Sequence, residues 1–214
     1  MHWAADDYPQ LLELATQLGG VGACLPLPWL TTTGTTIAGM AAMIPRMITV
    51  LLATAGAVLA TRPNTTEDEL DNLVEARLAR QAVLTRDDPP APLLWALVDE
   101  GVLYRPVAPA GVMYDQLMDL ARLSRLPNIT IQVVPYSAGG HTGLLGAFVM
   151  ADLGSSPGVV YVEDITDGRV FEDPDTVARV TLSYKSLQSE ALPKGASREL
   201  IVRVAEERWK GTTS

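Results

Sequence analysis

The sequence predicts an α+β fold in a single domain, with N-terminal helices, a central mixed but mostly antiparallel sheet, and two C-terminal helices. Apolar residues recur at intervals of three and four toward both ends of the chain, which is the period of an amphipathic helix. The middle of the chain instead holds short apolar runs separated by Gly- and Pro-containing turns, which are typical of strands. The chain has 214 residues and no linker-like stretch, so residues 1–214 are expected to form one domain with one large core.

Residues 1–62 form an apolar part that we expect to be helical. Leucines recur between residues 11 and 18, and Arg46 is the only charged residue between Glu13 and Arg62. The segment Met47–Ala60 is apolar but shorter than the roughly 20 residues that a membrane-spanning helix needs. We therefore expect a buried helix and no membrane association.

Residues 63–210 are expected to hold the sheet and the later helices. Thr66 and Glu69 have the spacing of a capping box, which predicts a helix to about Leu84. Strands are expected at residues 93–97, 129–134, 147–153, 159–165 and 169–172, with a second extended piece reaching residue 107. Further helices are expected from about residue 113 to a point before Pro127, at 175–191 beginning with Asp175, and at 197–205 with Ser197 as its N-cap.

Composition excludes several classes of function. The formal net charge is −9, from 16 basic and 25 acidic residues, and no basic run occurs, so no nucleic-acid partner is expected. Cys24 is the only cysteine, which rules out an intramolecular disulfide and a cysteine zinc cage. It reads as an inert thiol rather than a nucleophile, because its neighbours offer no base. The first ten residues are acidic and lack the pattern of a signal peptide, so we expect a cytoplasmic protein.

No motif of catalysis or metal binding stands out by its spacing. Ser137 lies four residues from His141, but the surroundings lack a nucleophile-elbow pattern, and a loop histidine without a catalytic role is the simpler interpretation. His141 has no nearby partner at ligand spacing, so neither a metal nor another cofactor is expected. The carboxylate pairs Asp99-Glu100 and Glu163-Asp164 read mainly as solvated faces or turn caps. A buried Glu163 could nevertheless act as a general acid.

Several segments in combination resemble a known family. They are EARLARQAVLTRDDPP at 75–90, LVDEGVLYRPV at 97–107, LPNITIQVVPYSAGGHTGL at 126–144, VVYVED at 159–164, and the tail ending AEERW. From about Arg62 to Trp209 the chain resembles the uncharacterised domain that follows the XRE-type helix-turn-helix in actinobacterial transcriptional regulators. The helix-turn-helix itself is absent here. The family's usual Pro-Gly-Leu-Leu-Gln-Thr motif is replaced around Ile44 by MIPRMITVLLATAGAVLAT.

The replaced segment leads to a hypothesis of ligand binding. Its methionines and leucines either fill a core or line a pocket, and flexible methionine suits irregular apolar ligands. We expect a cavity between an apolar helix around residues 43–51 and one face of the sheet. The expected ligand-binding residues are Met43, Met47, Leu51, Trp95, Phe148 and Tyr161. The expected catalytic residues are Glu163 as an acid, with Tyr136 and His141 at the mouth.

The resulting functional hypothesis is an apolar small-molecule binder in actinobacterial secondary metabolism. Under this hypothesis the protein is a cofactor-independent enzyme of the cyclase or cycloaddition type that is repurposed from a regulator domain. The enzyme would act by holding its substrate in a reactive conformer. The alternative is a non-catalytic ligand-sensing or partner-binding regulatory module that does not bind DNA. A third reading is a resistance protein that sequesters a drug. The sequence specifies neither the ligand nor the oligomeric state.

Overall fold

The computed structural model describes residues 39–44, 90–152, 158–163 and 168–211, together with positions 66, 68, 84, 85 and 87. The helices expected near residues 11–18, at 47–60 and through most of 66–84 lie outside these described residues, as do Met47 and Leu51. Among the described helices, none combines the length and the apolar character needed to cross a bilayer.

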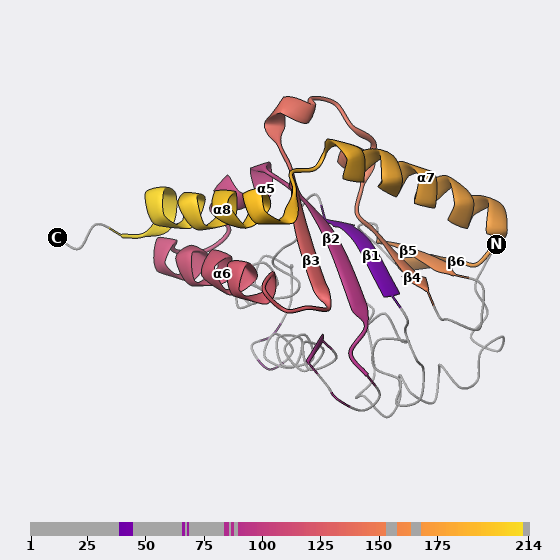
Figure 1. The fold of residues 1–214 in the computed structure, drawn as a ribbon, viewed down its shortest axis with the longest axis horizontal. Coiled ribbons are helices and arrows are strands. Elements are labelled where there is room, and N and C mark those ends of the chain that lie inside the picture. The colour runs from indigo at the N-terminus through magenta and orange to yellow at the C-terminus, as the bar shows by residue number, and fades with distance from the viewer. Residues whose placement is uncertain are drawn as a thin grey trace.

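A mixed sheet forms the centre of the described structure, with the strand order β3-β2-β1-β4-β5-β6 (Figure 1). The strands are β1 (Gly39–Ile44), β2 (Leu93–Asp99), β3 (Ile129–Val134), β4 (Phe148–Asp152), β5 (Val159–Glu163) and β6 (Gly168–Phe171). The first three strands are parallel to one another, and the other three strand pairs are antiparallel. The predicted α+β class with a mixed, mostly antiparallel sheet is confirmed.

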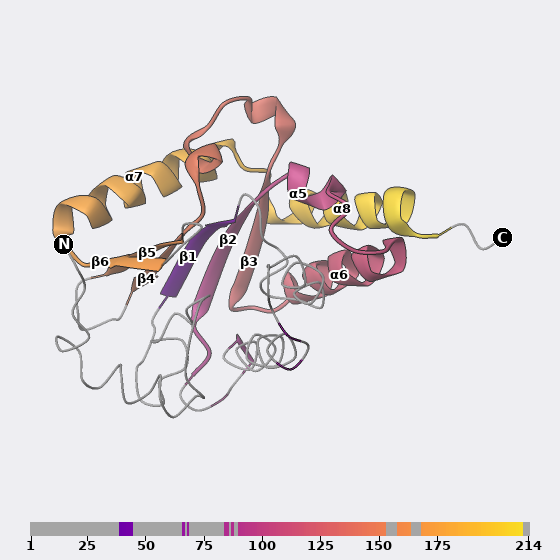
Figure 2. The ribbon, with the colours of Figure 1, turned by 180° about the vertical axis from the view of Figure 1, so that it is seen from behind.

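Helices cover both faces of the sheet (Figures 1 and 2). They are α5 (Gly101–Tyr104), α6 (Ala110–Leu123), α7 (Pro174–Glu190) and α8 (Lys194–Val204), which continues into a π-helical turn, η6 (Ala205–Trp209). Short 3₁₀ turns, η4 (Tyr136–Ala138) and η5 (Thr142–Leu145), follow β3. The two predicted C-terminal helices are confirmed as α7 and α8.

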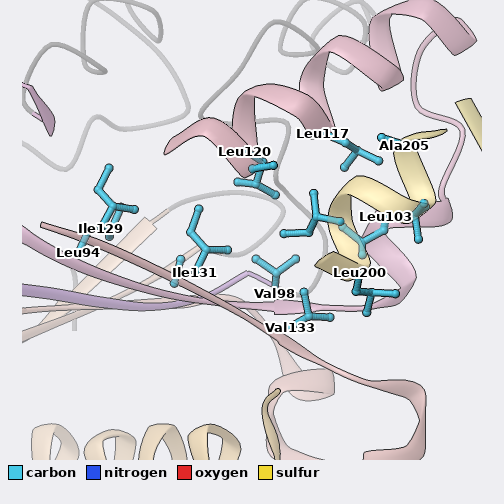
Figure 3. Close-up of a cluster of buried hydrophobic side chains, with 14 of the residues drawn as sticks. Leu94, Val98, Leu103, Leu117, Leu120, Ile129, Ile131, Val133, Leu200 and Ala205 are labelled. Carbon is cyan, nitrogen blue, oxygen red and sulfur yellow. The ribbon is translucent and has the colours of Figure 1, made fainter. Parts of the chain in front are cut away.

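Two apolar cores hold these layers together. On one face, Leu94, Ile131 and Val133 pack beneath α6 and α8 (Figure 3). On the other face, Leu97 and its neighbours pack against α7. Because both faces are covered, the parallel strands β2 and β3 are apolar along most of their length instead of strictly alternating.

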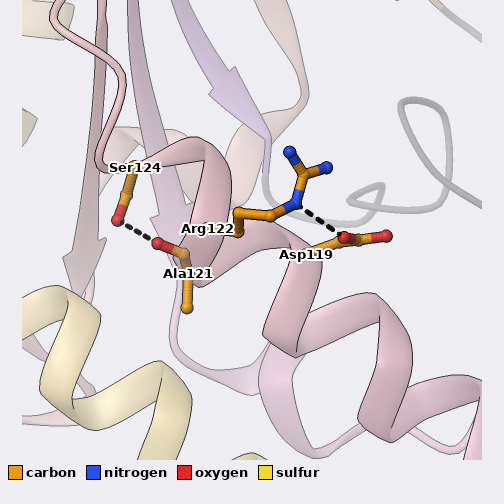
Figure 4. Close-up of polar contacts among 4 residues, drawn as sticks. All are labelled: Asp119, Ala121, Arg122 and Ser124. Carbon is orange, nitrogen blue, oxygen red and sulfur yellow. Dashed lines mark hydrogen bonds and ion pairs between the residues drawn. The ribbon is translucent and has the colours of Figure 1, made fainter.

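Local polar contacts fix where helices begin and end. At the end of α6, the Ser124 hydroxyl donates to the Ala121 carbonyl at 2.7 Å, and the Arg122 guanidinium pairs with Asp119 at 3.1 Å (Figure 4). At the start of α7, the Asp173 carboxylate accepts a hydrogen bond from the backbone N–H of Thr176 at 2.8 Å. This cap places the start of α7 at Pro174, slightly earlier than predicted.

Three local predictions are corrected. Residues 39–44 form a strand and not the start of a helix, because their backbone is paired on both sides, with β2 and with β4. Gly101–Tyr104 is helical and not extended, and it buries Leu103 completely. Ser197 is not an N-cap, because α8 already begins at Lys194 and the buried Ser197 hydroxyl accepts from the Val133 N–H of β3.

Candidate functional site

The carboxyl ends of β1, β2 and β3 meet at one edge of the sheet, because these strands are parallel and in register. This is the edge at which ligands commonly bind in parallel sheets. Asp99 is the last residue of β2 and lies opposite Val134, the last residue of β3. The candidate site is built around this aspartate.

Asp99 turns the chain from β2 into α5. Its Oδ1 accepts a hydrogen bond from the Gly101 N–H at 2.8 Å. A Cβ atom at Gly101 would lie 2.8 Å from this Oδ1 and 3.3 Å from the Tyr136 hydroxyl oxygen. A side chain at this position would push the Asp99 carboxylate away from the Gly101 N–H, so glycine lets Asp99, α5 and Tyr136 pack closely.

Residues 135–147, here called the 135–147 loop, cover the end of β2. The backbone N–H of Tyr136 donates to Glu100 Oε2 at 2.8 Å. The Tyr136 ring stacks on Tyr104 of α5, with centroids 6.1 Å apart and an interplanar angle of 29°. Gly139 has φ +64°, a left-handed conformation that favours glycine, and it turns the chain toward His141.

His141 faces Asp99 at the end of β2. Its Nε2 lies 3.4 Å from Asp99 Oδ2, and only 8% of the histidine side chain is exposed. In a neutral imidazole with its proton on Nε2, toward the carboxylate, Nδ1 carries a lone pair. Nδ1 is buried and has no hydrogen-bond partner within the described part of the chain.

A second buried polar atom lies nearby on α7. The Tyr184 hydroxyl is buried and also lacks a partner among the residues that the structure describes. Tyr184 packs against Leu97, which precedes Asp99 by two residues on the same face of β2. Two residues along a strand span about 7 Å, so the core that contains Tyr184 reaches close to the end of β2 at Asp99.

The local environment favours the neutral form of two tyrosines near this edge. Burial raises the pKa of Tyr184 to about 12, so its hydroxyl stays protonated at physiological pH. Burial also raises the pKa of Tyr136, and the Glu100 and Asp99 carboxylates add to this, with Arg105 opposing them. The edge therefore offers an oriented imidazole nitrogen and a neutral phenol in a region of negative potential.

The structure brings only some of the predicted site residues together. Tyr136 and His141 lie in the same loop at this edge, and 63% of Tyr136 is exposed. Phe148 packs in the α7 core and is therefore on the face of the sheet that α7 covers. Trp95 is on the same face, because Trp95 and Met150 lie on either side of the same residue of β1 and Met150 packs in that core.

Tyr161 corrects the predicted pocket wall. It lies opposite Val149, which packs in the α6–α8 core, whereas Phe148 is opposite Val162. Tyr161 is therefore on the other face of the sheet from Phe148 and Trp95, and these three aromatic residues do not line one cavity. The physical reason is that the register between β4 and β5 is offset by one residue from the pairing that would place Phe148 beside Tyr161.

The backbone of Glu163 lies away from this edge, and the side chains of the other predicted residues fall outside what the structure describes. Glu163 ends β5, three strands from β2, and a strand spacing of about 4.8 Å puts its backbone about 14 Å from that of Asp99. Met43 is in β1. The structure describes the backbone but not the side chains of Met43 and Glu163, and it describes neither backbone nor side chain of Met47 and Leu51.

Sequence reasoning does not identify Asp99, Glu100 and Tyr184 as site residues. The signal for the first two is their position directly after an apolar strand and before a glycine, which by itself indicates a turn cap. A turn cap accounts for Asp99 Oδ1 but not for the contact of Oδ2 with His141. Nothing in the helical spacing of Tyr184 sets its hydroxyl apart. Within the described residues, no group of three or more His, Cys, Asp or Glu could hold a metal ion.

The fold and this edge define a mixed α+β domain with a histidine–aspartate pair at the ends of its parallel strands. Residues 40–203 match the family described as Domain of unknown function (DUF5753), and the chain belongs to that family. The match begins within β1, so part of the segment that looks divergent in sequence belongs to the family. Neither the curated proteins nor the solved structures contain a match to the chain.

Proposed function

We propose that this domain binds a small, largely apolar molecule at the carboxyl edge of β1–β3, beside the 135–147 loop. The observation that carries the proposal is His141, a buried imidazole oriented by Asp99 whose Nδ1 has no partner in the described chain. Leaving a buried polar atom unbonded costs about 1–3 kcal/mol. A ligand that supplies the missing hydrogen bond recovers this free energy on binding.

Apolar side chains on the same loop support an apolar ligand. Leu144 is 57% exposed and Leu145 is 90% exposed, and both belong to η5, immediately after His141. The Tyr136 ring is exposed as well. Ligand sites typically combine such apolar surface with a few oriented polar groups.

A cofactor-free enzyme of the cyclase type is one role for such a binder. The Asp99–His141 pair favours it, because an imidazole held by a carboxylate with one free ring nitrogen has the arrangement of a general base. The remainder of the catalysis would come from holding the substrate in a reactive conformer.

A ligand sensor that does not bind DNA is the second candidate role. The 135–147 loop carries His141 on its buried side and the exposed Leu144 and Leu145 beside it, so occupancy at the histidine can change a surface that a partner contacts. The resemblance to domains of actinobacterial XRE-type regulators supports this role and a place in the cytoplasm.

A thermal-denaturation screen of apolar, metabolite-sized compounds tests the proposal. A ligand at 100 times its Kd stabilises a protein by about 2.7 kcal/mol, which gives a readily measured rise in Tm. His141→Ala should weaken binding of a hit by about tenfold, the equivalent of one hydrogen bond of about 1.4 kcal/mol. Ser189→Ala, at an exposed position of α7, is the matched control and should bind like the unaltered chain.

Binding that is unchanged by His141→Ala would contradict the proposed site. Chromatography of each hit after incubation separates the two roles, because a cyclised product has a different retention time from the compound that was added. A hit that is converted by the chain and not by His141→Ala supports the enzyme. A hit that is bound and recovered unchanged supports the sensor.

A further inference from the structure

The orientation of His141 restricts which chemical group can complete its hydrogen bonding. Asp99 Oδ2 lies 3.4 Å from Nε2, so in the neutral imidazole the ring proton is favoured on that nitrogen. The remaining atom, Nδ1, then accepts hydrogen bonds and cannot donate one. Its partner must therefore carry an O–H or N–H group.

The surrounding charges exclude anionic partners. Asp99 and Glu100 are adjacent at the end of β2, and the chain as a whole has a formal net charge of −9. A carboxylate or phosphate placed at Nδ1 would face the nitrogen lone pair and would lie near the Asp99 and Glu100 carboxylates. Like charges at this range in a partly buried site are strongly unfavourable.

The same carboxylates are poorly placed to hold a cationic ligand. Both oxygens of Asp99 are already engaged, with the Gly101 N–H and with His141. Glu100 Oε2 accepts from the Tyr136 N–H at 2.8 Å, which ties that carboxylate to the loop. An ammonium group there would leave water for a largely apolar loop surface, beside carboxylates that already hold structural contacts.

The Tyr184 hydroxyl offers a second polar contact. It is buried, has no partner in the described residues, and belongs to the core that contains Leu97, about 7 Å along β2 from Asp99. As a neutral phenol it can donate to a carbonyl or ether oxygen. The two buried atoms therefore need different partners. His141 Nδ1 needs a hydrogen-bond donor, whereas the Tyr184 hydroxyl can donate to an acceptor.

We infer that the ligand is an uncharged apolar molecule that presents a hydroxyl or amide N–H group to His141 Nδ1, and that carboxylated ligands are excluded. This inference rests on the proposed function, because it names the chemical class that the same site accepts. The apolar body of the molecule lies against the exposed Tyr136 and Leu144 of the loop. A Cβ atom added at Gly139 or Gly140 would meet no atom within 4 Å, so this part of the loop is open to solvent.

Four naphthalene probes of matched size test the inference. They are 2-naphthol, 2-methoxynaphthalene, 2-naphthamide and 2-naphthoate, titrated at pH 7.5 while the ring ¹⁵N signals of His141 and the amide of Tyr136 are followed by NMR. We expect 2-naphthol and 2-naphthamide to bind at least fivefold more tightly than the methoxy compound, and 2-naphthoate to show no saturable binding. The Nδ1 signal should move on binding of the two donors only.

Variants of the chain provide the controls. In His141→Ala the donor preference should vanish, so that naphthol and methoxynaphthalene bind equally. In His141→Gln, whose side-chain oxygen can accept, part of the preference should return. Ser189→Ala should behave as the unaltered chain. Amide spectra of each variant verify the fold.

The outcomes separate the inference from the proposed function. If the neutral probes shift the Tyr136 and His141 signals without preferring a donor, or if 2-naphthoate binds as tightly as 2-naphthol, the inference is overturned while the binding site stands. If no probe shifts these signals at any concentration up to its solubility, both the site and the inference fall.

Discussion

At the scale of single residues, substitution of Tyr184 by phenylalanine tests whether the Tyr184 hydroxyl lacks a hydrogen bond in the ligand-free protein. Removing a buried hydroxyl that has no partner relieves a desolvation cost, so Tyr184→Phe should leave the free energy of unfolding unchanged or raise it by about 1 kcal/mol. Urea denaturation followed by circular dichroism measures this. A loss of more than about 1 kcal/mol would mean that the hydroxyl makes a stabilising hydrogen bond.

The same residue makes stability depend on alkaline pH. The pKa of Tyr184 is raised to about 12 in the folded chain, against about 10 when unfolded, because burial disfavours the phenolate. Its contribution to stability is therefore complete below pH 10 and is lost as the pH rises toward 12. Tyr136 acts in the same direction, since its pKa is also raised.

Comparison of the two proteins isolates this effect. Between pH 9 and 11.5, the Tm of the unaltered chain should fall more steeply than that of Tyr184→Phe, and the curves should run parallel below pH 9. Parallel curves over the whole range would show that the phenol ionises as easily in the folded chain as in the unfolded one.

At the scale of elements, β3 is an edge strand whose free side is bonded by α8 and the α7–α8 connection. The Ser197 hydroxyl accepts from the Val133 N–H at 2.9 Å and donates to the Leu192 carbonyl at 3.0 Å. Leu192 in turn donates its N–H to the Val133 carbonyl, and Lys194 Nζ donates to the Ile129 carbonyl. These contacts satisfy backbone groups that an open sheet edge would otherwise expose.

Ser197→Ala should therefore cost about 1–3 kcal/mol of unfolding free energy, because it leaves the Val133 N–H buried without a partner. Ser189→Ala is a fitting comparison, since its hydroxyl bonds the Ser186 carbonyl at an exposed site and its loss should change stability by less than about 0.5 kcal/mol. Equal unfolding midpoints in urea for the two variants would show that Ser197 does not secure the edge of β3.

Sequence periodicity predicts these elements well wherever burial follows a simple repeat. The helix with Val177, Tyr184 and Leu187 and the strand at 129–134 can be located because apolar positions recur at the expected spacing. The strand GMAAMI escapes prediction, since its small apolar residues lack alternation and its identity comes from pairing with distant strands. Pairing of this kind is a tertiary property that no local pattern encodes.

The candidate site is predictable only in part for the same reason. Tyr136 and His141 are close in sequence, so a glycine-rich loop is enough to group them. The contact of His141 with Asp99 joins residues 42 positions apart and depends on the parallel order of β2 and β3. The offset that separates Tyr161 from Phe148 likewise arises from strand register, in which a one-residue change moves a side chain to the opposite face.

At the scale of the whole molecule, charge determines which large partners the chain can bind. The chain carries 16 basic and 25 acidic residues, and binding to duplex DNA draws its free energy mainly from basic groups that displace counterions from phosphates. Two described basic side chains already face carboxylates, Arg122 with Asp119 and Lys210 with Glu206. Each such pair lowers the positive potential available to a phosphate.

We therefore expect these 214 residues to show no submicromolar affinity for duplex DNA, even at about 50 mM salt, where nonspecific electrostatic binding is strongest. Fluorescence anisotropy of a labelled random duplex measures this, with a basic DNA-binding protein as the positive control. Saturable submicromolar binding that weakens steeply with salt would reveal a basic surface that the composition hides. The same titration with a ligand from the screen should give the same result, because an uncharged ligand adds no positive charge to the chain.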